Sequence, residues 1–475
     1  MIEEPVGPAP TASGSIASDP AVAAPPAGVG QPGFVGRVAG VFAARISVFA
    51  IGLVTSLLLA GLLGKDGRGE YAVVMLVPGT LYALATFGLP SSTTFYAGRG
   101  RSLRSLRKVT LVMAAAASIW LMAMALAALP FLEKSFLQTA PDYLLKLVLL
   151  AIPFQFGSAL LGCILFGRQV VRNYNAILVV QSAALLVGIL LLTGVFGLGV
   201  YGAVVAFLLT TAAGSAAVLL EVGRVVRHDE PGRQPVRYGE LLGYGFKLYP
   251  SVITSFFNYR ADVFLLSWLL ASQGQIGLYV VAVSLAEIAF YPPDAISSIF
   301  FPRVAAASRA EADRAVADVS RLTLLTTLGV AVAIVPAALF VCYVILPGYT
   351  GAIPALLVLL PGVVALSISK VLQGYLIGLG KAWPVGVAAG AAVVANVGFN
   401  LVLIPAWGIV GASASSLLSY SLNAAILALA ASRSSGQPVW SFVLIRPSDV
   451  RRLLRTGLTL IRRLLAPRVG RASTD

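Results

Sequence analysis

Seven charged residues lie in stretches of the chain that are otherwise apolar enough to cross a membrane. They are Arg45, Lys247, Arg260, Asp262, Glu287, Asp294 and Lys370. A charge at the centre of a bilayer costs about 3 kcal/mol or more, so it normally faces the interior of a helix bundle or a water-filled path. Because charges of both signs occur there, the sequence predicts a polar cavity through the middle of the protein, and we expect the function to reside in it.

The composition identifies the chain as a polytopic membrane protein. Of its 475 residues, 58% are apolar and only 11% are charged, and the mean hydropathy is +0.90, whereas soluble domains carry about 25% charged residues. The net charge of +15 comes from loops and tails, so it does not indicate nucleic-acid binding. Cys163 and Cys342 fall in apolar stretches and are best explained as packing residues. A single histidine, His228, argues against a histidine metal site.

Twelve apolar stretches are long enough to span a bilayer, which takes about 20 residues each. Their predicted bounds are 38–63, 71–97, 109–131, 143–166, 174–196, 199–222, 247–270, 277–301, 321–346, 353–378, 383–405 and 408–431. Loops after the even-numbered stretches hold 16 Lys and Arg, whereas loops after the odd-numbered ones hold 4. By the positive-inside rule, both termini are predicted to be cytoplasmic.

The two halves of the chain resemble each other. Leu58–Tyr71 matches Leu265–Tyr279, and Gly199–Ala203 matches Gly408–Ala412, at offsets of 207 to 209 residues. Repeats of six spans each run parallel, and such architectures place the substrate site between the halves. The predicted fold is therefore an all-α membrane protein with two six-helix lobes facing across a central cavity.

These spans divide the chain into five predicted regions. They are a disordered cytoplasmic tail at 1–36, an N-terminal lobe at 37–223, a cytoplasmic linker at 224–246, a C-terminal lobe at 247–432 and a basic cytoplasmic tail at 433–475. The first tail is rich in Pro, Ala, Gly and Ser and has no basic segment, so we do not expect a signal peptide. The last tail predicts an amphipathic helix on the anionic cytoplasmic leaflet, or alternatively a partner-binding helix. Its arginines are Arg451, Arg452, Arg455, Arg462 and Arg463.

Three parts of the sequence resemble a known family of transporters. They are LLAGLLGKDGRGEYAVV with FGLPSSTTFYAGRG, at 58–74 and 87–100; YRADVFLLSWLL, at 259–270; and ANVGFNLVLIPAWGIVGASASSLLSY, at 395–420. In this order they are similar to the bacterial polysaccharide repeat-unit flippases of the multidrug/oligosaccharidyl-lipid/polysaccharide exporter superfamily. The likeness extends from about residue 38 to residue 432.

The resemblance implies a V-shaped pair of lobes around a cationic cavity in the bacterial inner membrane. It also implies movement of undecaprenyl-pyrophosphate-linked oligosaccharides from the inner to the outer leaflet for polysaccharide biosynthesis. The implied partners are this substrate, membrane lipids and, by association, a polysaccharide polymerase and export machinery. No cofactor is implied, although transport could be coupled to H⁺ or Na⁺.

Other functions stay open at this point. A drug/cation antiporter and a lipid II flippase belong to the same superfamily, and a pseudo-transporter could act as an assembly scaffold. A membrane glycan polymerase or ligase is a further alternative. Such an enzyme generally needs a sizeable external loop with acids, and the longest external connection, about 132–142, is short.

Within this reading, the cations inside spans are candidates for binding the pyrophosphate. Arg260 lies near mid-depth of its span, where a planar guanidinium suits a pyrophosphate held away from water. It could instead pair with Glu287 or Asp262 inside the protein. Arg45 could collect the headgroup or extend to the membrane surface, and Lys370 could complete the cationic path or form a structural pair.

The acids and amides inside spans are the remaining candidates. Asp262, Glu287 and Asp294 could couple transport to an ion, since a carboxylate beside a cation can exchange that partner for a proton or Na⁺. They could equally neutralise the arginines, and Asp294, which follows two prolines, could cap a helix. Four amides could contact sugar hydroxyls or, alternatively, hydrogen bond between helices. They are Asn258, Gln373, Asn396 and Asn400.

Overall fold

Helices form the framework of the chain in a computed structural model that describes residues 34–133, 140–229, 234–451 and 453. The first half contains α1 (Phe34–Ala85), α2 (Leu89–Gly98), α3 (Leu103–Glu133), α4 (Asp142–Leu149), α5 (Ile152–Gly167), α6 (Val171–Ile189), η2 (Leu190–Val195) and α7 (Gly199–Arg227). The second half contains α8 (Tyr238–Leu269), α9 (Gln273–Ala286), η3 (Glu287–Phe290), α10 (Tyr291–Ala306), α11 (Arg309–Phe340), η4 (Val341–Ile345), η5 (Pro347–Tyr349), α12 (Ala352–Gly378), α13 (Ala382–Ser435) and α14 (Trp440–Val443).

Two of these helices are long enough to cross a bilayer twice. α1 breaks at Gly64 (φ 65°) and α13 breaks at Gly408 (φ 56°), in a left-handed conformation that glycine adopts without steric cost. Among the described residues, nine helical stretches are apolar and long enough to span a membrane. Counting α1 and α13 twice and adding α8 accounts for all twelve predicted spans.

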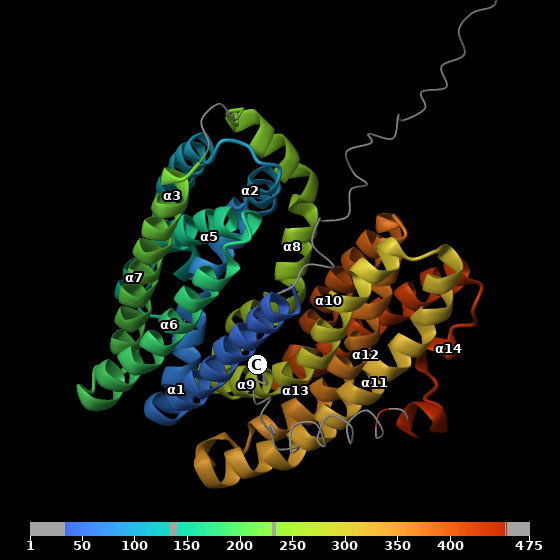
Figure 1. Cartoon of the computed structure of the whole chain (residues 1–475). Helices are drawn as coiled ribbons and strands as arrows, with labels where there is room; N and C mark the ends of the chain where they lie inside the picture. The colour runs from blue at the N-terminus through green and yellow to red at the C-terminus, as the bar shows by residue number, and fades with distance from the viewer. Residues whose placement is uncertain (1–33, 134–139, 230–233, 452, 454–475) are drawn as a thin grey trace, which may run out of the picture.

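The apolar core is divided between two bundles of helices, which lie side by side with α8 between them (Figure 1). Phe156 belongs to a buried cluster within the first bundle, and Tyr375 to a buried cluster within the second. A third cluster joins the bundles, because it contains Val73 of α1 together with Tyr279 of α9. The predicted all-α fold of two facing lobes is therefore confirmed.

Backbone contacts hold the lobes together at the end of the molecule where α1 breaks. A Cβ on Gly69 would lie 1.8 Å from the carbonyl oxygen of Gln273, and one on Gly277 would lie 2.0 Å from that of Lys65. Only residues without a Cβ permit such an approach. We call this end, defined by these four residues, the closed end.

At the opposite end, the connection between the lobes is fastened to the N-terminal lobe. It runs from the end of α7 to the start of α8, within the predicted linker at 224–246. Asp229 of this connection pairs with Arg168 at 3.1 Å, and Glu240 in the first turn of α8 pairs with Arg101 at 3.1 Å. We call this end, marked by these two arginines, the basic end.

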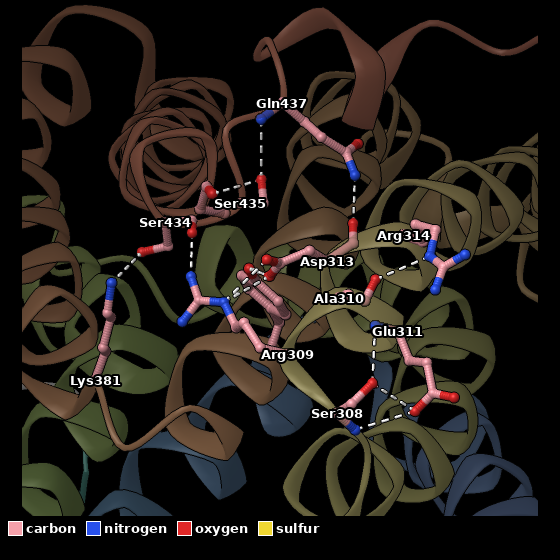
Figure 2. A network of polar contacts seen from close by, with 12 residues as sticks. Ser308, Arg309, Ala310, Glu311, Asp313, Arg314, Lys381, Ser434, Ser435 and Gln437 are labelled. Atoms are coloured by element: carbon pink, nitrogen blue, oxygen red, sulfur yellow. Dashed lines mark hydrogen bonds and ion pairs between the residues drawn. The ribbon is translucent and has the colours of Figure 1, made fainter.

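A polar network joins helix ends of the C-terminal lobe (Figure 2). Arg309 of α11 donates to Asp313 at 2.9 Å and to the carbonyl oxygen of Ser434. Lys381, just before α13, donates to the Ser434 hydroxyl at 3.0 Å, and the Gln437 amide donates to the carbonyl oxygen of Asp313. The network links the start of α11 to both ends of α13, so these helices form one unit.

Candidate functional site

A cavity of about 820 Å³ lies between the lobes, in the position that the sequence predicts. α1 and α6 line it from the N-terminal lobe, and α9, η3 and α10 line it from the C-terminal lobe. Its charged and polar lining residues are Arg45, Ser56, Asn175, Ser284, Glu287, Tyr291 and Asp294. Arg45 and Ser56 are 11 residues apart on one helix, so the cavity extends about 16 Å along α1.

Arg45 is exposed at the end of the cavity farther from the closed end. One helical turn further along α1, Phe49 contacts Tyr291 of α10, with 4.0 Å between the ring centroids. This aromatic pair is a direct contact between the lobes within the cavity wall. An anion beside Arg45 would therefore lie next to an apolar surface that both lobes contribute.

Two carboxylates face the same cavity from the C-terminal lobe. Asp294 accepts an ion pair from Lys370 of α12 at 2.5 Å, and the Lys370 ammonium lies 4.6 Å from the centre of the Phe290 ring. Lys370 is mostly buried, with 16% of its side chain exposed, whereas 60% of the Asp294 side chain is exposed. Glu287 lines the cavity about two helical turns nearer the closed end than Asp294. The lining thus combines one exposed cation, two acids and an acid-paired lysine behind them.

Arg260 of α8 is not among the residues that line this cavity, but it lies within electrostatic reach of Glu287, which does line it. Its side chain is exposed and forms no ion pair within the part of the chain that the structure describes. Its charge acts electrostatically on the carboxyl groups of Glu287 and Asp262. Asp262 and Glu287, the two acids predicted to neutralise Arg260, therefore lie near it without a direct contact.

Asp262 is buried inside the C-terminal lobe, two residues beyond Arg260. The hydroxyl of Tyr279 donates to one of its carboxylate oxygens, and the backbone amide of Val263 donates to the other at 2.9 Å. A small cavity of about 20 Å³ joins Asp262 and Tyr279 to Glu287. The Asp262 carboxyl group is thus enclosed by hydrogen-bond donors and connected to Glu287.

The four amides predicted to contact sugars occupy different environments. Asn396 and Asn400 are buried in α13, where Asn400 donates to Asn396 at 2.9 Å and Asn396 donates to Ser419 at 3.2 Å. Gln373 is exposed on α12 and is not among the residues that line the large cavity. The side chain of Asn258, like that of Lys247, lies outside the described part of the structure.

At the closed end, the cavity stops at a hydrogen bond between the lobes. The hydroxyl oxygens of Ser56 on α1 and Ser284 on α9 are 3.0 Å apart. Arg68, from the turn after Gly64, donates to the Ser56 hydroxyl at 3.1 Å and is 6% exposed. By sequence, this arginine is one of the four Lys and Arg in the loops after the odd-numbered stretches. Its position between Gly67 and Gly69, directly before an apolar span, was the available signal that it could turn inward.

The chain after α14 packs on α11. Arg321, which is 3% exposed, donates to Asp449 at 2.9 Å, to the carbonyl oxygen of Ser441 at 2.7 Å and to Asp318. Residues 447–451 are helical and Arg451 is exposed. The other arginines of the predicted surface helix fall outside the described residues. They are Arg452, Arg455, Arg462 and Arg463.

Comparison with known proteins places this architecture in a family. The chain matches the model of the family "Polysaccharide biosynthesis protein" over residues 38–308. No curated protein matches it by sequence. It is similar to the solved structure "Lipid II flippase MurJ, inward closed conformation", with 16% identity, a TM-score of 0.69 and coverage of 89% of this chain and 95% of that one.

Two transporter structures give the same picture. An inward-facing multidrug resistance MATE family transporter of the MOP superfamily shares 16% identity and a TM-score of 0.68, covering 83% of this chain and 98% of that one. An outward-facing conformation of such a transporter shares 17% identity and a TM-score of 0.60, covering 84% and 95%. At these identities the likeness establishes the fold, which is that of twelve-helix transporters.

Proposed function

The chain belongs to the polysaccharide biosynthesis protein family, and from that premise we propose that it moves undecaprenyl-pyrophosphate-linked oligosaccharides across the bacterial inner membrane. The observation that carries the proposal is the cavity of about 820 Å³ between the lobes, with the exposed Arg45 at one end and the lobes in contact at the other. A cavity closed at one end is what a transporter needs in order to expose a polar headgroup to one side at a time.

In the proposed orientation the basic end faces the cytoplasm, as the positive-inside rule favours, and both termini lie there. The pyrophosphate meets Arg45 and Lys370 first, and Arg260 then binds it further inside, while the polyprenyl chain stays in the lipid. Binding to Lys370 requires that the headgroup displace Asp294. Rocking of the lobes then exposes the cavity to the outer leaflet, where a polymerase and export machinery would receive the glycan.

We propose that an ion gradient drives the cycle through the acids of the C-terminal lobe. Asp262 is buried and held by Tyr279, and Glu287 lies between it and the large cavity. A proton or Na⁺ that reaches Asp262 would change the charge facing Arg260, and Asp294 would contribute through its pair with Lys370. A ligand can shift the balance between two conformations only by binding one of them better, and these acids supply such a difference.

The test is transport of a fluorescent polyprenyl-pyrophosphate oligosaccharide in proteoliposomes. Arg260→Ala should lower the transport rate by about tenfold or more, because a fixed cation that binds the headgroup is removed. The variant should remain folded, since Arg260 is exposed and forms no ion pair within the described residues. Transport by Arg260→Ala at the wild-type rate would overturn the assignment.

A second function is favoured by one specific feature of the cavity. Its lining contains two acids, Glu287 and Asp294, and the aromatic pair Phe49 and Tyr291. Acids and aromatic rings are the groups that bind organic cations, so a drug/cation antiporter is the alternative. Efflux of a lipophilic cation from the same proteoliposomes, with no movement of the polyprenyl pyrophosphate, would establish it.

A further inference from the structure

A buried arginine lies at the closed end of the cavity without an acidic partner. The Arg68 side chain donates from Nη2 to Ser56 at 3.1 Å, and its Nε has no hydrogen-bond partner. Among the described residues, no carboxylate forms an ion pair with it. A buried charge is costly unless it is paired, so this position is suited to an anion that is supplied from outside.

The neighbours of Arg68 strengthen this reading. Its guanidinium lies over the Tyr71 ring, 5.8 Å from the centroid, and it is close enough to Tyr349 and Arg260 for electrostatic interaction. The aromatic ring provides a planar surface for the guanidinium. Arg260 brings a second positive charge, and a shared anion would relieve the repulsion between the two arginines.

Arg68 is also hydrogen bonded to a residue of the contact between the lobes. Ser56, its hydrogen-bond partner, is 3.0 Å from Ser284 of the other lobe, and both serines line the deep end of the cavity. A chain of two hydrogen bonds thus runs from Arg68 through α1 to α9. Any group that binds Arg68 in place of the Ser56 hydroxyl breaks this chain at the closed end.

We infer that Arg68 is an outer anion site, which takes the pyrophosphate of the substrate from the inner cations and thereby releases the Ser56–Ser284 contact. The inference rests on the proposed function. A pyrophosphate can form two parallel hydrogen bonds with a guanidinium, whereas the serine hydroxyl forms one, so the substrate outcompetes Ser56. Binding at Arg68 then favours the conformation in which the lobes separate at the closed end.

The experiment measures opening of the closed end by the distance between spin labels. Phe196→Cys in the first lobe and Tyr343→Cys in the second are exposed reporter sites at that end, in a protein whose Cys163 and Cys342 are replaced by alanine. The probes are undecaprenyl pyrophosphate and, as headgroup alone, inorganic pyrophosphate. Native mass spectrometry reports binding of the lipid, and proteoliposomes report transport.

Arg68→Met removes the charge and retains volume beneath the tyrosine ring, and replacement of a buried charge by an apolar side chain of similar size is often tolerated. We expect the wild-type label distance to lengthen with either probe. Arg68→Met should still bind the lipid within about threefold of wild type, show no lengthening, and transport about tenfold more slowly. Arg68→Lys should restore part of the lengthening of the label distance and part of the transport rate. If Arg68→Met does not fold, Arg68→Gln takes its place in the experiment.

Tyr349→Phe is the matched control for the contact between the lobes. The Tyr349 hydroxyl donates to the carbonyl oxygen of Ala60 at 3.1 Å, a neutral hydrogen bond at the same end. If Tyr349→Phe loses as much transport as Arg68→Met, the loss comes from a weakened contact between the lobes and not from removal of the positive charge. The anion site is then overturned. Wild-type transport by Arg68→Met also overturns it. If the wild-type protein neither binds nor transports the lipid, the proposed function itself is wrong. That outcome differs from the two above, in which the wild-type protein is active.

Discussion

At the scale of residues, the ion pairs of this protein differ in how far their side chains are exposed. Lys370 and Asp294 form a pair at the edge of the cavity, with most of the carboxylate exposed. Arg321 forms a buried network that fixes the chain after α14. The Asp294 carboxylate of the first pair is open to the cavity, whereas the arginine at the centre of the second network is only 3% exposed.

Asp294→Asn should therefore strengthen binding of the lipid headgroup. The substitution removes the carboxylate that competes for Lys370, and a half-exposed pair is worth about 1 kcal/mol or less, so we expect up to about fivefold higher affinity for undecaprenyl pyrophosphate. Native mass spectrometry titrations measure this affinity. The control is Asp142→Asn, which breaks an exposed pair with Lys146. Unchanged or weaker binding by Asp294→Asn would show that Lys370 is purely structural.

Arg321→Ala should release the segment after α14 from α11. Loss of a buried cation that has two acidic partners costs roughly 3 kcal/mol, so amide hydrogens of residues 440–450 should exchange faster by mass spectrometry. Arg314→Ala is the control, because Arg314 is exposed and its side chain bonds within its own helix. Equal exchange in both variants would contradict the docking role.

The same contact should depend on pH only in acid. Burial opposes the effect, but the Arg446 backbone amide and the Arg321 guanidinium hold the pKa of the Asp449 carboxyl below its ordinary value of 3.8. A carboxyl group whose pKa is lowered by folding stabilises the folded state at pH values above its unfolded pKa. This stabilisation is lost as the pH falls through the pKa of the folded state. Exchange in residues 440–450 should thus be steady from about pH 5 to about pH 8, after correction for intrinsic rates, and rise below about pH 4. A rise near pH 6 would contradict this.

At the scale of elements, glycines decide how the lobes close. α1 turns at Gly64 and returns as a second span, and the turn brings Gly69 against the start of α9. The reciprocal contact is made by Gly277 of α9 against Lys65. Because backbone meets backbone at both points, the interface cannot absorb a side chain by changing a rotamer. Closure at this end therefore depends on two positions that lack a Cβ.

Gly277→Ala should shift the protein toward the conformation that is open at the closed end. The added Cβ would lie 2.0 Å from the Lys65 carbonyl oxygen, and overpacking of this kind costs about 1–3 kcal/mol. The spin-label pair at 196 and 343 measures the resulting population. Gly386→Ala, where a Cβ meets nothing within 4 Å, is the control. An unchanged distance distribution in Gly277→Ala would mean that the interface yields elsewhere.

At the scale of the whole molecule, the two lobes contribute different charged residues to the region between them. The N-terminal lobe contributes Arg45 to one end of the cavity, and Arg68 stands behind Ser56 at the other, both from α1. The C-terminal lobe contributes the acids and Lys370. α8 joins them, because it begins on the N-terminal lobe through Glu240 and carries Arg260 to within electrostatic reach of Glu287. In the proposed cycle, movement of one lobe against the other would change which acids face which cations.

Asp262→Asn should uncouple transport from the ion gradient. The amide cannot take up a proton and is a weaker Na⁺ ligand, so acceleration by an imposed H⁺ or Na⁺ gradient should be lost while slow transport without a gradient remains. Initial rates in proteoliposomes with and without each gradient test this. Glu221→Gln is the control, since Glu221 is a buried carboxylate bonded to Asn173 and Arg224 away from the cavity. A full response to the gradient in Asp262→Asn would exclude the role.

The sequence by itself determined the class of fold, the twelve spans and the membership of the family. These follow from local quantities, namely the length and hydropathy of each stretch and the glycines that break it, which do not depend on distant residues. It also located the cavity in general terms, because charges inside apolar spans must face a polar interior. The predicted roles of individual cavity residues stay predictions.

Only the tertiary structure decided which of these residues meet. Lys370 and Asp294 are 76 residues apart in sequence, and Ser56 and Ser284 are 228 apart. No local pattern specifies such partners, since a charge in one span can face any of several neighbouring helices. The same reason explains why Arg68, a loop residue by sequence, turns inward to Ser56, and why Asn396 and Asn400 lie inside the C-terminal lobe rather than on the cavity. Helix rotation and packing, rather than residue type, set which side chains reach the cavity.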